Sequence, residues 1–303
     1  MDVYLPIANL SVNGLIIVGL GLLTGMLSGI FGVGGGFLTT PLLIFYGIPP
    51  TVAAASAASQ VTGASVSGML AHHQRGGVDY RMGVVLVLGG VLGTGLGALL
   101  FSLLQALGQI DTVINLLYVS MLGGIGAMMA RESIQTLRAG SSGARPARKR
   151  RHHPLVARLP GRWRFYRSGL YISPLAPLLL GMFTGILTML MGIGGGFVLV
   201  PAMLYILGMS AQVVVGTSLF QILFVTMATT MMHALTTRAV DIVLAGLLLI
   251  GSVSGAQLGA RFATTASPVK LRLALAAIVL AVAARMALGL TWRPDEIFTV
   301  SLL

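Results

Sequence analysis

Residues 25–41 read GMLSGIFGVGGGFLTTP, and residues 185–201 read GILTMLMGIGGGFVLVP. Six of the ten positions in the stretch 32–41 are identical in the stretch 192–201. A cluster of glycines inside an apolar run interrupts a helix, because glycine adopts backbone conformations that end it. Interrupted helices at matching places in two halves of a membrane protein indicate where a transporter binds its substrate.

The same register extends over most of the chain. At offsets of 160 to 162 residues the matching pairs are Ser56 with Thr217, Gln60 with Gln221, His72 with His233, Asp79 with Asp241, and Gly89, Gly93 and Gly97 with Gly251, Gly255 and Gly259. So many matching glycine, glutamine, histidine and aspartate residues at a nearly constant offset are not expected by chance. The pattern therefore predicts a duplicated unit.

The composition is that of a membrane protein. Hydrophobic residues make up 56% of the chain and charged residues only 9%, whereas soluble domains carry about 25% charged residues. The chain has no cysteine, which excludes disulfides and thiolate metal sites. The net charge of +12 is concentrated, since eleven of the 19 Lys and Arg residues lie between Arg131 and Arg167. We expect this basic segment to set the orientation and to meet anionic lipids, and we expect no binding to nucleic acid.

Each half of the chain contains five hydrophobic segments. They lie near Leu10–Ile30, Gly36–Tyr46, Val52–Leu70, Met82–Leu104 and Thr112–Met129, and near Pro174–Met191, Gly196–Leu207, Val213–Leu235, Ile242–Phe262 and Leu271–Leu290. The second segment of each half is shorter than the roughly 20 residues that span a bilayer. The sequence therefore predicts an all-α polytopic membrane protein with two inverted-topology repeats, in residues 1–130 and 171–303. Each repeat is a glycine-broken helical hairpin followed by three transmembrane helices, and residues 131–170 form a basic linker.

The loops predict the orientation. Positive residues favour the cytoplasmic side, which places the linker and the loops 72–81 and 261–272 there. The loop 105–111 has no Lys or Arg and is expected outside, together with both termini. The loop 236–241 is also expected outside, and Arg238, its one basic residue, argues against this assignment. Each half then crosses the membrane an odd number of times, which makes the halves inverted copies.

The inverted halves predict a binding site for an anion. Helices are expected to begin near Gly36 and Gly196 and to approach the midplane from opposite sides. A helix start carries unpaired N–H groups and roughly half a positive charge, and glycine lets a ligand come close to them. The expected binding residues are Gly32, Gly34, Gly35, Gly36, Gly192, Gly194, Gly195 and Gly196. Close helix packing is the alternative for these glycines, and it is our interpretation of the four-residue glycine spacing at 89–97 and 251–259.

Polar side chains on the next helix of each half extend the candidate site. Ser56 and Gln60 are four residues apart and share a helix face, and Thr217 and Gln221 repeat the pair. Their hydroxyl and amide groups are candidate substrate ligands. Hydrogen bonding between helices is the alternative.

Histidines and aspartates follow on the same segments. His72 and His233 end the helix in each half and are candidates for proton coupling or gating, with an ordinary interfacial position as the alternative. Asp79 and Asp241 each precede a helical run and are expected to cap it. The sequence contains no HExxH motif, nucleophile elbow or carboxylate cluster. We therefore expect neither an enzyme nor a bound metal or cofactor.

The duplicated Gly-x-Gly-Gly-Gly-Phe-x-x-x-Pro, with Gln60, the Gly-x-x-x-Gly helix and the basic linker, resembles the TauE/SafE sulfite exporter family. The resemblance covers about Gly19 to Arg285. It implies a carrier in the bacterial inner membrane that moves a small sulfur-containing or organic anion, such as sulfite, sulfoacetate or another sulfonate. It fixes neither the substrate nor the direction of transport. The second copy has Met189 where the first has Gly29, so the two half-sites are not strictly equivalent.

Two alternative functions remain open at this point. A passive anion channel would use the same site without proton coupling, and a membrane assembly factor would transport nothing. The sequence gives no indication of the oligomeric state.

Overall fold

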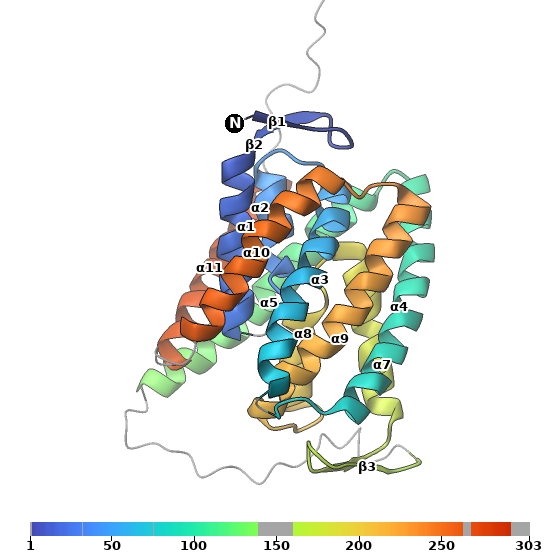
Figure 1. Ribbon diagram of the computed structural model, residues 1–303, viewed down its shortest axis with the longest axis vertical. Helices are drawn as coiled ribbons and strands as arrows, with labels where there is room; N and C mark the ends of the chain where they lie inside the picture. Colours follow the sequence, from blue (N-terminus) through green and yellow to red (C-terminus); the bar gives the residue numbers. More distant parts are fainter. Residues whose placement is uncertain (1, 32, 75, 139–159, 263–267, 292–303) are drawn as a thin grey trace, which may run out of the picture.

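The computed structural model describes residues 2–31, 33–74, 76–138, 160–262 and 268–291, and within them the chain is mostly helical (Figure 1). The first half contains β1 (Asp2–Leu5), β2 (Leu10–Asn13), α1 (Gly14–Phe31), α2 (Gly36–Phe45), α3 (Pro50–Gln74), α4 (Tyr80–Ala106) and α5 (Ile110–Arg138). The second half contains β3 (Trp163–Phe165), β4 (Leu170–Ile172), α7 (Leu175–Met191), α8 (Gly196–Tyr205), α9 (Ala211–Met232), a π-helix (His233–Thr237), α10 (Ile242–Phe262) and α11 (Pro268–Thr291). Gly32, Arg75 and most of the basic linker lie outside the described residues.

Six described helices are long and apolar enough to cross a membrane. They are α1, α4, α5, α9 with its π-helical extension, α10 and α11. Helix α3 has 25 residues but is rich in alanine and serine, and it lies between other helices. Helices α2 and α8 have ten residues each, which rise only about 15 Å and cover half of a bilayer core. The prediction that the second segment of each half is too short to span is confirmed.

Two helix pairs depend on glycine stripes. On α4, a Cβ added at Gly89 or Gly93 would lie 2.1 Å or 2.0 Å from a backbone oxygen of α7. On α10, a Cβ at Gly251 or Gly255 would lie 2.1 Å or 2.2 Å from a backbone oxygen of α1. No side chain fits at these distances, so the packing interpretation of these stripes is confirmed.

Two β-hairpins correct the expectation of an all-α chain. Strands β1 and β2 pair antiparallel, as do β3 and β4. Asn9 and Gly169, which are 160 residues apart, both adopt positive φ in the turns, at 51° and 66°. The two hairpins lie at opposite ends of the molecule (Figure 1). They escaped prediction because strands of three or four residues leave no hydrophobic run to detect.

Asp79 and Asp241 cap helices, as predicted, and also hold the hairpin of the other half. One oxygen of Asp79 accepts a hydrogen bond from Met82 N at 3.2 Å, at the start of α4. The other oxygen accepts from the backbone N and hydroxyl of Ser168, at 2.9 and 2.6 Å. Asp241 caps α10 in the same way and accepts from Ile7 N at 3.0 Å. These paired contacts tie each half to the other.

The glycine stripes generate a stability prediction. We expect Gly93→Ala to destabilise the protein by about 1–3 kcal/mol, because overpacking forces α4 away from α7. Gly95→Ala on the same helix is the control, since a Cβ there meets no atom within 4 Å and alanine favours a helix over glycine. Thermal unfolding of purified protein measures both. Equal unfolding temperatures for the two variants would contradict the packing.

Candidate functional site

Each glycine cluster forms a tight turn that ends one helix and starts the next; we call residues 33–36 and 193–196 the glycine turns. Gly34 and Gly35 have φ of 89° and 69°, and Gly194 and Gly195 have φ of 76° and 71°. Side chains rarely tolerate these values. Gly35 and Gly195 stand at the N-cap positions of α2 and α8, which confirms the expected helix starts.

The two glycine turns touch each other. A Cβ at Gly36 would lie 3.1 Å from Ile193 Cα and 2.7 Å from the carbonyl oxygen of Gly192, the residue before the second turn. A Cβ at Gly196 would lie 2.3 Å from the carbonyl oxygen of Val33. The rings of the next residues, Phe37 and Phe197, stack with centroids 4.8 Å apart and planes 10° apart. Close packing therefore accounts for part of the glycine requirement, and it brings the starts of α2 and α8 together.

Two glutamines beside the turns are buried without full hydrogen bonding. Gln60 and Gln221 have no exposed surface. The Gln60 amide nitrogen donates a long bond of 3.4 Å to the Thr24 hydroxyl. Within the described residues, the Gln60 carbonyl oxygen and both polar atoms of the Gln221 amide lack a partner. Buried polar groups almost always have partners, so these atoms indicate a site where a ligand or water would supply them.

In the first half, the glutamine and the glycine turn share neighbours. The carbonyl oxygen of Thr24 lies 2.9 Å from the Cβ position of Gly35, so Thr24 touches both the turn and Gln60. Val61, which follows Gln60, lies 3.2 Å from the Cβ position of Gly34 and 2.8 Å from that of Gly194. Helix α3 therefore presents its glutamine next to residues that contact both turns.

The second half repeats this arrangement through α9. Ile222, which follows Gln221, lies 2.8 Å from the Cβ position of Gly194 and 3.4 Å from that of Gly34. The Gln221 amide nitrogen lies 3.0 Å from the Cβ position of Gly90 on α4. A side chain at position 90 would therefore crowd the amide.

Four hydroxyl residues at the site were missed by the sequence analysis. Ser28 lies 3.2 Å from the Cβ position of Gly35, and the Thr188 hydroxyl lies 3.1 Å from that of Gly195. Thr24 and Thr184 are buried one turn earlier on α1 and α7. Both pairs are 160 residues apart, the offset of the glycines themselves, so extending that register backward would have found them.

Ser56 and Thr217 lie one helical turn from the glutamines and bond to other helices. The Ser56 hydroxyl accepts a hydrogen bond from Asp241 N at 3.1 Å, and the Thr217 hydroxyl accepts one from Asp79 N at 3.0 Å. These bonds supply the interhelical role that the sequence left as the alternative. A part in substrate binding stays a prediction for both residues.

The two histidines differ in environment. His233 is fully buried, and its Nε2 lies 3.0 Å from the Met189 carbonyl oxygen. Its ring packs edge-on against Phe101, with centroids 5.0 Å apart. His72 is partly exposed near the end of α3. Their helices end at opposite ends of the molecule (Figure 1), and a coupling or gating role stays a prediction.

The arrangement offers a ligand neutral donors and helix starts rather than charged side chains. No group of three or more His, Asp or Glu residues in the described part of the chain could hold a metal ion. Two converging helix starts favour a negative charge. The chemistry therefore suits a small anion.

Comparison with known proteins identifies one family and several membrane transporters as relatives of this chain. The model of the family described as "Sulfite exporter TauE/SafE" matches residues 17–286. A probable membrane transporter protein of Xylella fastidiosa is 30% identical over 279 residues, which cover 90% of this chain and 95% of that protein. The probable membrane transporter protein YjnA of Bacillus subtilis is 27% identical over 267 residues, with coverage of 87% and 96%. No solved structure matches.

The family is one of transporters rather than enzymes, and these relatives are bacterial membrane transporters. The six helices that can span a membrane agree with this class. The chain therefore belongs to the TauE/SafE sulfite exporter family of multi-pass membrane transporters.

Proposed function

We propose that this protein is a secondary transporter that exports a small sulfur-containing or organic anion, such as sulfite, sulfoacetate or another sulfonate. The anion is held at the membrane midplane between the two glycine turns, with Gln60 and Gln221 as side-chain ligands. The observation that carries the proposal is the pair of buried glutamines with unpartnered amide atoms beside the two converging helix starts.

Electrostatics favours neutral ligands for an anion at this depth. An anion in hydrocarbon is prohibitively unfavourable unless its water shell is replaced. The starts of α2 and α8 and the glutamine amides supply N–H donors for that purpose. A lysine or arginine at this depth would bind an anion more tightly and slow its release. Neutral donors allow the repeated binding and release that a carrier needs.

We further propose that the halves are inverted repeats. Each half repeats the order hairpin, helix, short helix and three long helices. Helix α1 follows the hairpin at one end of the molecule, and α7 follows the hairpin at the other end (Figure 1). The contacts of Asp79 and Asp241 with the opposite half are equivalent. Inverted halves would let the structure open alternately to either side.

The proposed site predicts opposite effects on stability and affinity. Gln60→Leu and Gln221→Leu keep much of the shape but remove the amide. We expect anion affinity to fall roughly tenfold or more in each variant, since a hydrogen bond to a charged group contributes about 1.5–3 kcal/mol. We expect Gln221→Leu to unfold at an equal or higher temperature, because it removes two unpartnered polar atoms.

Calorimetry with sulfite, sulfoacetate and sulfate measures affinity, and proteoliposome flux with and without a pH gradient measures transport. Gln257→Leu, at an exposed position of α10, is the control and should change neither. Unchanged affinity in the Gln60/Gln221 double variant would place the site elsewhere. Flux that ignores the pH gradient would exclude proton coupling through His72 or His233 and favour a passive channel.

The proposed orientation in the bacterial inner membrane has its own test. The basic linker lies in the cytoplasm if the positive-inside rule holds. Because the chain has no cysteine, Gln109→Cys and Gly143→Cys each introduce a single thiol. We expect an impermeant maleimide to label position 109 in intact cells and position 143 only after lysis. Labelling of both in intact cells would contradict this topology.

A further inference from the structure

A second feature lies on the linker side of the glycine turns. A cavity of about 320 Å³ is lined by the end of α1, the C-terminal part of α5, one side of α8 and the starts of α9 and α11. We call it the entry cavity. Its inner wall includes Val33 and Phe197. The Val33 carbonyl contacts Gly196, and the Phe197 ring stacks on Phe37. The entry cavity therefore extends from the end of α5, which leads into the basic linker, to the back of the glycine turns.

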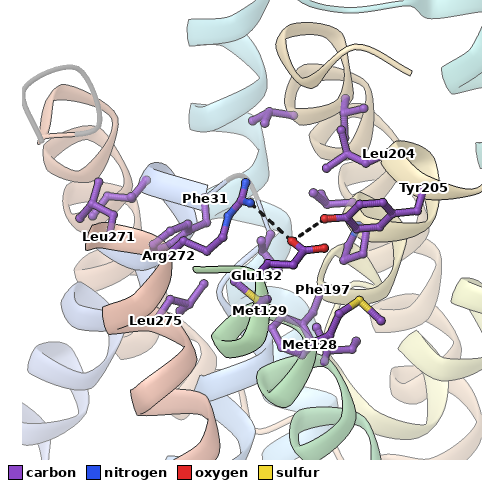
Figure 2. Close-up of a pocket in the computed structure, with 17 residues that line it drawn as sticks. Phe31, Met128, Met129, Glu132, Phe197, Leu204, Tyr205, Leu271, Arg272 and Leu275 are labelled. Atoms are coloured by element: carbon purple, nitrogen blue, oxygen red, sulfur yellow. Dashed lines mark hydrogen bonds and ion pairs between the residues drawn. The ribbon is translucent and has the colours of Figure 1, made fainter. Parts of the chain in front are cut away.

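The charges of the entry cavity are confined to one place. Among its described lining residues, Glu132 and Arg272 are the two that carry a charge, and nearly all the others are apolar. One carboxylate oxygen of Glu132 lies 3.6 Å from a guanidinium nitrogen of Arg272 and accepts a hydrogen bond of 2.6 Å from the Tyr205 hydroxyl. Figure 2 shows Glu132 between the two partners, which come from α11 and α8.

The ion pair is one that a ligand can open. The side chains of Arg272 and Glu132 are 48% and 35% exposed, and their contact is long. Such pairs contribute little to stability, because water and salt screen them. If Arg272 turns to another anion, the Glu132 carboxylate keeps its hydrogen bond from Tyr205 and remains in contact with water. Exchange of one anion for another at Arg272 therefore leaves no buried charge unpaired.

We propose that Arg272 is an entry subsite for the anion and that Glu132 occupies it when no ligand is present. The guanidinium group presents parallel N–H donors that match two oxygens of a sulfite or sulfonate group. A cation at the mouth of an apolar cavity raises the local concentration of anions. The anion then passes from Arg272 to the neutral donors of the glycine turns. No charged side chain at the turns holds the anion there permanently. This inference rests on the proposed function, because it takes the glycine turns as the destination.

The test uses the cysteine-free chain and does not require transport. Ile125→Cys places one thiol in the wall of the entry cavity, two helical turns and about 10 Å deeper than Glu132. The probes are the sulfonate 2-sulfonatoethyl methanethiosulfonate and its uncharged 2-hydroxyethyl analogue. They are added to the medium around inverted membrane vesicles, in which the linker side of the protein faces outward. The ratio of their reaction rates reports attraction of a sulfonate and cancels changes in access.

We expect Arg272→Gln to lower this ratio and Glu132→Gln to raise it, each on the order of 3- to 10-fold, because one charge at the mouth is removed. Arg272→Lys should keep most of the ratio. Arg138→Gln is the control, since it removes one positive charge from an exposed position on α5 outside the lining. An unchanged ratio in Arg272→Gln, or a thiol that neither probe reaches, would overturn the subsite. Ratios as expected in a protein whose unsubstituted form moves no candidate anion in proteoliposomes would instead contradict the proposed function while leaving the subsite in place.

Discussion

The contact between the two glycine turns is the constraint on which the rest of the structure depends. Gly36 meets the Gly192 carbonyl and Gly196 meets the Val33 carbonyl at distances that exclude any side chain. The contact brings two half-length helices to meet end to end at Phe37 and Phe197. It also fixes where α3 and α9 must cross, since Val61 and Ile222 each pack on both turns. The surface that the two turns present is made of backbone, so the fold rather than flexible side chains sets its shape.

Stability and function make different demands on the same region. The glycine stripes of α4 and α10 let helix backbones pack closely, and Asp79 and Asp241 accept backbone hydrogen bonds at the starts of α4 and α10. The glutamine amides beside the glycine turns reduce stability instead, because burial of a polar group without a partner costs about 1–3 kcal/mol. We propose that this cost is retained because the amides bind the anion. In the proposed account, the anion is attracted at Arg272 and then held by neutral donors, so strong attraction and easy release belong to different places.

The sequence predicted the parts of this structure that depend on local chemistry. The doubled glycine cluster marked both helix breaks, and Asp79 and Asp241 marked the starts of α4 and α10. The four-residue glycine spacing identified the packed faces. Contacts between residues far apart in the chain could not be predicted from the sequence. Glu132, Tyr205 and Arg272 are separated by dozens of residues, and no repeat relates them, so only the fold brings them together. The unsatisfied amides of Gln60 and Gln221 were likewise invisible, because a hydrogen-bond partner is a property of the packed interior.

The proposed anion site, where the starts of α2 and α8 meet beside the two glutamines, can be tested by crystallography. Selenite is the heavier analogue of sulfite, and its selenium can be located by anomalous scattering in crystals of the protein. We expect one selenium peak within hydrogen-bonding range of the Gln60 and Gln221 amides and of the backbone N–H groups that begin α2 and α8. A selenium peak that is well occupied elsewhere, with none between the glycine turns, would contradict it.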